Sequence, residues 1–463
     1  MTNNLVIIGN GILGTLSAIE IKRKYPKLKV QIIGNKKRPY SASTGAGAMA
    51  NVYAEIENGP YKDRNEARFL KIGLSARQRW LKIFDQLKIS KKIITAKDTI
   101  VFLKKNPSRF ENYNYNNMKE VAIADNKAHL LSKKKIKEYF PNTYEKIQEA
   151  TILKDEFAIC TVALFKCLEK IQDKYGIISV DSHVKKIKTI SNNKLKIHLQ
   201  NEHKSIIANK IVVTAGSNSE LLFEKKLNLI PMLQGVGSAI ILNNIYNLPE
   251  SFQKYVIRTV NRGGAQCGLH TVPRSNGTLY LGAGNYISRP GISNHRLETI
   301  RYLYDLFSDE LVGKNIAYPL FGDISLGYRP RTLDGFPSIG HHKKYSNIFF
   351  ATGTNRVGLT WAPEIVIQVL KWLDGKEISS DFCGWHPDRK IISYGNEKSC
   401  IKYFVDSRLS AGLEHSNFSK TQTKKMRKEL TSLALKQIKK IKSLYPGTMI
   451  NPDNWQVILS KEL

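Results

Sequence analysis

The sequence lacks several features that would each define a class of protein. Its 463 residues contain no uninterrupted apolar run of about 18 residues, so we expect no transmembrane segment. No basic segment precedes the apolar N-terminal stretch, which argues against a secretory signal and for a cytoplasmic protein. The five cysteines are odd in number and widely spaced, and none forms a C-x-x-C pair. We therefore expect reduced thiols, no disulfide framework and no metal site.

Acidic residues are also scarce, since 39 Asp and Glu stand against 72 Lys and Arg and leave a net charge of +33. Lysines gather in residues 133–137, 424–428 and 436–442. Such a surface attracts anions, so an acidic carrier protein, a nucleic acid or an anionic surface is a candidate partner. The alternative is a lysine-rich composition whose basic faces are simply solvated. The charge bears on association and solubility rather than on fold.

The N-terminus carries the pattern of a dinucleotide-binding turn. An apolar run leads directly into G-x-G-x-x-G at Gly9, Gly11 and Gly14, and a helix-like segment and a second apolar run at 30–33 follow. The first glycine allows a tight turn, the second lets the backbone approach phosphate, and the third lets the helix pack on the strand. The helix N-terminus faces the anion. The alternative is a glycine-rich turn in an ordinary α/β protein.

Beyond this unit the chain alternates helix-like and strand-like segments up to about residue 392. Helical patterns cover 65–86, 132–139 and 363–373, and apolar or alternating runs at 99–103, 210–214, 236–242 and 348–353 predict strands. Two amphipathic basic helix patterns, 398–413 and 420–444, then follow. We therefore predict an α/β protein with a C-terminal helical extension at 393–463.

Four further segments complete a pattern in chain order. They are Ser43-Thr44-Gly45-Ala46-Gly47-Ala48-Met49, Ile211-Val212-Val213-Thr214-Ala215-Gly216-Ser217, Gly327-Tyr328-Arg329-Pro330-Arg331-Thr332-Leu333-Asp334-Gly335-Phe336-Pro337 and Ala351-Thr352-Gly353-Thr354-Asn355-Arg356-Val357-Gly358-Leu359-Thr360-Trp361-Ala362-Pro363. With the N-terminal turn, the chain resembles the flavin amine oxidoreductases of the D-amino-acid oxidase superfamily, closest to the glycine oxidase branch. The order and spacing match over about residues 5–390, and residues 393–463 fall outside the resemblance.

The resemblance implies a fold of two interleaved domains. A Rossmann-like FAD-binding domain would comprise residues 1–85, 151–228 and 326–392. An antiparallel-sheet substrate domain would comprise 86–150 and 229–325. The basic helical extension would follow as a third part.

The resemblance also implies FAD as the cofactor. It would bind without a covalent bond, because no cysteine lies near Gly327, where the sarcosine oxidase branch attaches it. Where the family has an acidic residue for the ribose hydroxyls, this chain has Gly34 followed by Asn35, whose amide could supply a neutral hydrogen bond. The residues assigned to the cofactor are Gly9, Gly11, Ile12, Leu13, Gly14, Asn35, Ser43, Thr44, Gly45, Ala46, Gly47, Ala48, Val184, Ala215, Gly216, Arg329, Thr354, Asn355, Arg356, Val357, Gly358, Leu359 and Thr360.

Two arginines are assigned to the substrate by the same resemblance. Arg329 would hold a substrate carboxylate through a bidentate guanidinium, and Arg356 would supply a second arginine from the closing loop. The alternative for both is a structural ion pair. Met49 and Tyr286 are expected to line the same pocket.

Two positions depart from the glycine oxidase branch. His270 stands where that branch usually has tyrosine, and Asn285 stands where it usually has an apolar side chain. Both changes make the pocket more polar and favour a substrate with an additional anionic or polar group. His270 would titrate near neutral pH, unless it only packs and donates one hydrogen bond.

The predicted enzyme oxidises the C–N bond of a small amino acid or related amine, anionic or N-substituted, to an imine that then hydrolyses. It passes the electrons to O2 or another acceptor. One alternative is a tRNA-modifying flavoprotein of the same superfamily, whose tail helices would bind phosphate. Another is a non-catalytic flavin-fold binding module. The extension could also be an oligomerisation element.

Overall fold

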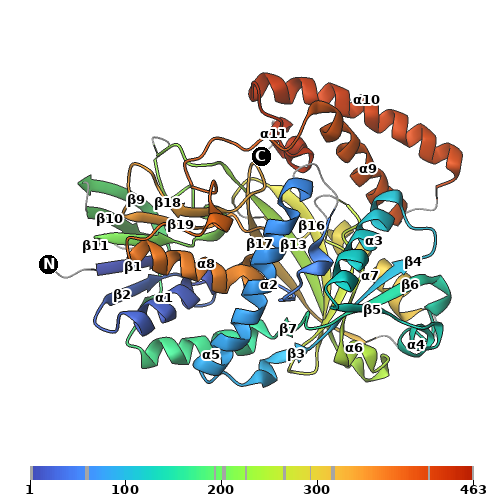
Figure 1. Cartoon of the computed structure of the whole chain (residues 1–463), viewed down its shortest axis with the longest axis horizontal. Helices are drawn as coiled ribbons and strands as arrows, with labels where there is room; N and C mark the ends of the chain where they lie inside the picture. The colour runs from blue at the N-terminus through green and yellow to red at the C-terminus, as the bar shows by residue number, and fades with distance from the viewer. Residues whose placement is uncertain are drawn as a thin grey trace.

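A six-stranded, mostly parallel sheet forms one half of the molecule (Figure 1). It is seen in a computed structural model that describes residues 4–57, 62–191, 194–200, 205–224, 227–263, 267–291, 293–313, 319–415 and 418–460. The strand order is β18-β19-β12-β1-β2-β8, and β18 is the antiparallel edge strand. The strands are β1 (Asn4–Ile8), β2 (Lys29–Ile33), β8 (Ile178–Val180), β12 (Lys210–Val213), β18 (Ser338–His341) and β19 (Ile348–Thr352).

Apolar side chains of this sheet alternate between two cores because successive strand residues point to opposite faces. In β1, Leu5 and Ile7 pack against the helices on one face, whereas Val6 and Ile8 pack against a small antiparallel sheet on the other. The helices are α1 (Ile12–Lys24), α2 (Lys62–Gln86), α5 (Thr161–Lys174) and α8 (Gly358–Leu373), and the small sheet comprises β9 (Val184–Ser191), β10 (Lys194–Leu199) and β11 (Ser205–Ala208). A parallel strand that is covered on both faces has a continuous apolar sequence. The apolar runs 210–214 and 348–353 predicted such strands, and they form β12 and β19.

An eight-stranded sheet forms the other half, in the order β17-β13-β16-β15-β14-β4-β6-β5. All its neighbours are antiparallel except β14 and β4. Its strands are β4 (Thr99–Lys104), β5 (Ala128–Leu130), β6 (Ile147–Leu153), β13 (Met232–Asn243), β14 (Val256–Arg258), β15 (His270–Pro273), β16 (Leu279–Ser288) and β17 (Leu320–Thr332). Helices α3 (Arg109–Ala124), α4 (Lys133–Tyr139), α6 (Ser251–Lys254) and α7 (Leu297–Leu306) accompany it, and a two-stranded pair joins β3 (Ile94–Ala96) to β7 (Ala158–Ile159).

The C-terminal extension folds as α9 (Glu397–His415), α10 (Lys420–Leu444) and α11 (Trp455–Leu459). Its apolar side chains share one core with Phe110 of α3 and Leu233 of β13, so the extension packs on the eight-stranded half (Figure 1). Ser419 and Gln422 form a capping box at the start of α10, which spans the predicted residues. Among the described helices, none is both long and apolar enough to cross a bilayer.

Candidate active site

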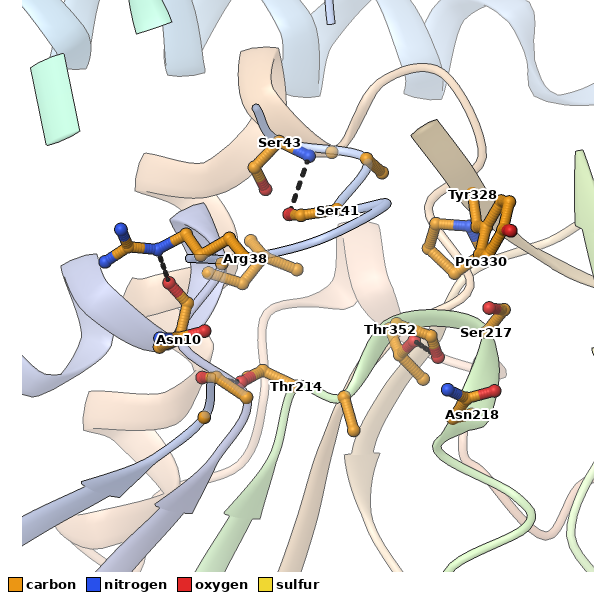
Figure 2. A pocket seen from close by; sticks show the side chains of 18 of the residues that line it. Asn10, Arg38, Ser41, Ser43, Thr214, Ser217, Asn218, Tyr328, Pro330 and Thr352 are labelled. Atoms are coloured by element: carbon orange, nitrogen blue, oxygen red, sulfur yellow. Dashed lines mark hydrogen bonds between the residues drawn. The ribbon is translucent and has the colours of Figure 1, made fainter. Parts of the chain in front are cut away.

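A cavity of ≈ 290 Å³ lies where β1, β12 and β19 end and where β17 passes the first sheet (Figure 2). It lies at the carboxyl ends of parallel strands, the usual ligand position in such folds. Most residues predicted for the cofactor line it: Gly9, Gly11, Ile12, Leu13, Asn35, Ser43, Ala46, Val184, Ala215, Gly216, Arg329, Thr354, Asn355, Arg356, Gly358 and Leu359. The others do not reach its wall; they are Gly14, Thr44, Gly45, Gly47, Ala48, Val357 and Thr360.

The glycines of this turn are required because a side chain at Gly9 or Gly14 would collide with the backbone. Gly9 has φ +107°, and a Cβ there would collide with the carbonyl of Thr214. A Cβ at Gly14 would collide with the carbonyl oxygen of Gly9. Gly14 therefore lets α1 pack on the end of β1 and acts behind the cavity wall, as its motif position predicts.

Asn10 and Arg38 line the cavity and were not predicted. A Cβ at Gly34 would lie 2.5 Å from the Asn10 Oδ1, so the Asn10 amide fills the space beside Gly34. Arg38 Nε donates to the Asn10 carbonyl at 2.8 Å, a contact visible in Figure 2, and its Nη1 pairs with Glu169 at 2.6 Å. Asn35, the predicted ribose partner, lies with its Nδ2 3.3 Å from His183 Nε2. The position of Asn10 between the first two glycines of the motif was the signal that could have identified it.

Two helix N-termini face this cavity. Ile12 and Gly358, the first residues of α1 and α8, both line it. The main-chain N–H of Ile12 donates to the Ser43 hydroxyl at 3.0 Å. Helix N-termini carry partial positive charge, so both would stabilise an anion bound in this cavity.

The Arg329 side chain lies against two glycines of the neighbouring strand. It extends from β17 opposite Gly235, and a Cβ at Gly237 would lie 2.5 Å from its guanidinium carbon. Its Nη1 donates to the Asn285 Oδ1 at 2.7 Å. Among the described residues Arg329 forms no ion pair with a carboxylate. The structure thus brings together Arg329 and Asn285, and the Gly-Val-Gly pattern of β13 was the signal that sequence reasoning missed.

Arg356 lies in a cluster of opposite charges. Its Nη2 pairs with Glu57 at 2.8 Å and its Nε with Glu55 at 3.5 Å. Glu55 also pairs with the buried Arg258 at 2.8 Å. Burial would lower the pKa of Arg356, but the two carboxylates hold that pKa above its ordinary value. The ion pair was the alternative left open for Arg356, and Glu55, Glu57 and Arg258 were not predicted.

His270 is buried and uncharged. Its Nδ1 donates to the Gly268 carbonyl at 2.8 Å, and burial, with Arg258 nearby, lowers the pKa of His270 to about 3. The prediction that His270 titrates near neutral pH is therefore wrong, because the loss of water around the ring and the charge of Arg258 outweigh the carboxylate of Glu55. The structure agrees with the alternative, in which His270 packs and donates one hydrogen bond. Its ring stacks on Tyr280, whose hydroxyl donates to the Gly45 carbonyl at 3.0 Å.

Met49 and Tyr286 do not reach either described cavity. The Met49 carbonyl accepts a hydrogen bond from Thr360 Oγ1 at 3.2 Å. Tyr286 donates to the Asn294 carbonyl at 2.7 Å, and Arg296 lies over its ring. Because Asn285 and Tyr286 are consecutive strand residues, they point to opposite faces of the sheet. The structure thus contradicts the prediction that Tyr286 lines the pocket.

A second cavity of ≈ 90 Å³ adjoins the first and shares Thr354, Asn355 and Arg356 with it. Its wall also contains Asn51, Val52, Glu55, Ile56, Glu57, Glu66, Phe69, Leu70, Gly335, Pro337, Gly353, Val357 and Trp361. Among the described residues of this wall, the charged ones are acidic apart from Arg356.

The C-terminal extension contacts the residues around Arg329 and Arg356. The Tyr403 hydroxyl donates to Glu57 Oε1 at 3.3 Å, and Asp453 pairs with Arg331 at 3.1 Å. These contacts were not predicted, because the extension lay outside every recognised motif.

The glycine turn, the helix N-termini and the eight-stranded sheet that lies against the cavity define a dinucleotide-binding α/β protein. The family model for FAD dependent oxidoreductases matches residues 4–365. The chain belongs to that family, and its cofactor is FAD. The residues present fit this group, because the N-terminus of α1 faces the cavity and Gly9 and Gly11 add no side chain to its wall.

Similar proteins include oxidases of small amines. A glycine oxidase of Geobacillus kaustophilus (strain HTA426) is 28% identical over 133 residues, which are 29% of this chain and 34% of that protein. The alignment therefore spans about a third of that relative's length.

Solved structures share the fold over most of the chain. Glycine oxidase from Geobacillus kaustophilus has a TM-score of 0.70 at 18% identity, over 84% of this chain and 100% of that one. Iminodiacetate oxidase from Chelativorans sp. BNC1 has a TM-score of 0.68 at 15% identity, over 83% of this chain and 98% of that one. L-alpha-glycerophosphate oxidase from Mycoplasma pneumoniae, with FAD bound, has 0.66 at 17%, over 85% and 100%. At these identities the likeness shows the fold.

Proposed function

We propose that the protein oxidises the C–N bond of a small amino acid or related amine to an imine, which water then hydrolyses. The observation that carries the proposal is Arg329, a cationic side chain on the cavity wall whose described partner is the neutral amide of Asn285. A guanidinium is well suited to hold a carboxylate by two parallel hydrogen bonds. The glycine oxidase among the relatives and the iminodiacetate oxidase among the structural neighbours also act, by name, on amines that carry carboxylates.

FAD, when bound in this cavity, would supply the acceptor for two electrons. Arg329 would fix the substrate carboxylate and thereby orient the adjacent carbon, which loses a hydrogen with its electron pair while the nitrogen loses a proton. Asn285 would hold the guanidinium in place. The N-terminus of α8, which lines the cavity, would stabilise an anionic group bound beside it.

No side chain is assigned as a proton acceptor. His270 is neutral and its Nδ1 donates to the Gly268 carbonyl, so it is a packed side chain rather than a titrating base. The amine would therefore react in its unprotonated form. We expect kcat/KM to rise with pH until the substrate amine has lost its proton.

Anaerobic absorbance spectra of the purified holoprotein test the proposal. Glycine, sarcosine, D- and L-amino acids, iminodiacetate and aminophosphonates would be added in turn. We expect bleaching of the flavin band by at least one amine that carries a carboxylate, and re-oxidation on admission of O2 or a quinone identifies the acceptor. A yellow protein that none of these amines bleaches would contradict the proposal.

A further inference from the structure

Tyr403 connects the C-terminal extension to the carboxylates around Arg356. The match to the family ends at residue 365, and the extension begins beyond it. Tyr403 of α9 is buried, and its hydroxyl donates to Glu57 Oε1 at 3.3 Å. The other carboxylate oxygen of Glu57 accepts from Arg356 Nη2 at 2.8 Å. A residue outside the family fold thus contacts the carboxylate that pairs with a cavity arginine.

Among the described residues, Arg356 belongs to a network of ion pairs. Arg356 and Arg258 supply two positive charges, and Glu55 and Glu57 supply two negative ones, joined by ion pairs of 2.8 to 3.5 Å. Asn261 Nδ2 also donates to Glu57 at 3.3 Å and helps to fix its carboxylate. A charge that is already paired at short distance attracts a further anion much less than an unpaired one.

Arg329 differs from Arg356 in this respect. Its described hydrogen-bond partner is the amide of Asn285, which carries no charge. Both arginines line the larger cavity. On the far side of Arg356, the smaller cavity is lined by Glu55, Glu57 and Glu66. An anionic group that extended past Arg356 would meet carboxylates, and like charges at short range repel.

We infer that Glu57 and Tyr403 are specificity-determining residues that keep Arg356 paired, so that the site accepts substrates with one carboxylate and disfavours those with two. This inference rests on the proposed amine oxidation and narrows its substrate class. Tyr403 acts through Glu57 and is a positioning residue. The polar side chains of the pocket had favoured a substrate with an additional anionic group, whereas the ion pairs favour the opposite.

Binding of unreactive anions to the oxidised holoenzyme tests the inference without turnover. Acetate and malonate, which carry one and two carboxylates and no amine, would be titrated while the flavin absorbance is followed. We expect Glu57→Gln to shift the malonate-to-acetate affinity ratio by about tenfold or more towards malonate, because Arg356 loses its nearest negative charge. An unchanged ratio would overturn the inference.

Tyr403→Phe provides a milder variant in case Glu57→Gln fails to fold. It removes one hydrogen bond to Glu57, so we expect a shift of about two- to fivefold in the same direction. The matched control is Tyr445→Phe, at an extension tyrosine that lines neither described cavity, and it should leave the ratio unchanged. Equal ratios for the Tyr403 variant and the control would also overturn the inference, and thermal unfolding shows that each variant is folded.

Failure of the inference and failure of the proposed reaction give different results. If amines bleach the flavin but neither variant changes the ratio, the reaction stands and the role of Glu57 and Tyr403 is wrong. If no amine bleaches the flavin but the ratio shifts, the charge pairing selects anions and the proposed reaction is wrong.

Discussion

The two ends of the larger cavity are built from different kinds of residue. At the α1 end, Gly9 and Gly11 bring main-chain groups to the wall, and the contacts that define the turn are short-range or lie between adjacent strands. At the other end, Arg329 and Arg356 are charged side chains whose partners lie far away in the chain; Arg356 and Glu57 are 299 positions apart. The α1 end requires the absence of side chains, which the spacing of glycines in a short motif provides. The other end depends on which charged groups lie beside each arginine, and only the folded chain brings those groups together.

The α1 end is most sensitive to added volume, and Gly14→Ala should have the largest effect. Its methyl group would collide with the Gly9 carbonyl oxygen, so we expect a loss of about 3 kcal/mol or more in the free energy of unfolding, together with loss of FAD. Denaturant unfolding and the flavin-to-protein absorbance ratio measure both.

Gly412→Ala is the matched control for this change, because its methyl group would meet the flexible end of Met426 at 3.0 Å. We expect that variant to stay within about 1 kcal/mol of the parent. Full FAD content and parental stability in Gly14→Ala would show that the packing of α1 on β1 does not limit the turn.

The proposed substrate end of the cavity should be most sensitive to loss of charge at Arg329. We expect Arg329→Gln to lower kcat/KM for the amine substrate by about a hundredfold or more while FAD stays bound, because the carboxylate loses its charged partner. Steady-state kinetics and flavin content separate the two effects. Arg301→Gln, which changes an exposed arginine paired with Asp305 on α7, should leave kcat/KM unchanged. A parental value of kcat/KM in the Arg329→Gln variant would contradict the assignment of Arg329 to the substrate site.

The buried His270 makes the stability of the fold sensitive to acid. Its pKa is about 3 in the folded protein against an ordinary value of 6.5, so between these values the unfolded chain binds a proton that the folded one does not. Stability should therefore fall as the pH drops through this window, by at most about 1.4 kcal/mol per pH unit from this group.

We expect His270→Gln to lose stability less steeply than the parent when denaturant unfolding is compared at pH 6.5 and pH 5. His129→Gln, at an exposed position of β5, should retain the parental pH dependence. Parallel curves for the parent and His270→Gln would contradict the assignment of a neutral, desolvated imidazole.

The smallest effect is expected for Gly237→Ala. Its methyl group would overlap the guanidinium of Arg329, which must move by bending a flexible side chain. We expect KM for the amine to rise about tenfold with FAD content unchanged. In an Arg329→Gln background the same substitution should have little further effect, and additive effects in this double-mutant cycle would contradict the proposed contact.

Much of the fold could be predicted because the relevant patterns are local. Buried parallel strands appear as apolar runs, and α10 begins and ends as its amphipathic pattern predicts. Helix α3 was missed because its Asn- and Tyr-rich segment hides the apolar periodicity, although Ser108 caps it by accepting from the Glu111 N–H. The boundaries of the interleaved domains stay a prediction.

The candidate site was also predictable only where its features are local in the sequence. Motif positions located Gly9, Gly11, Arg329 and the loop before α8 at one cavity. They could not show that Tyr286 faces away, that His270 loses its charge, or that Tyr403 contacts Glu57 from 346 positions away. These outcomes depend on strand register, burial and long-range pairing.

The amino-acid pattern alone was sufficient for the dinucleotide turn, the family and the presence of a separate basic helical extension, because glycine spacing and hydrophobic periodicity act over a few residues. The folded chain was needed to distinguish Arg329, whose described partner is neutral, from Arg356, which is paired with carboxylates. The physical reason is that an arginine binds an anion according to the charges around it, and those charges come from segments that only folding brings together.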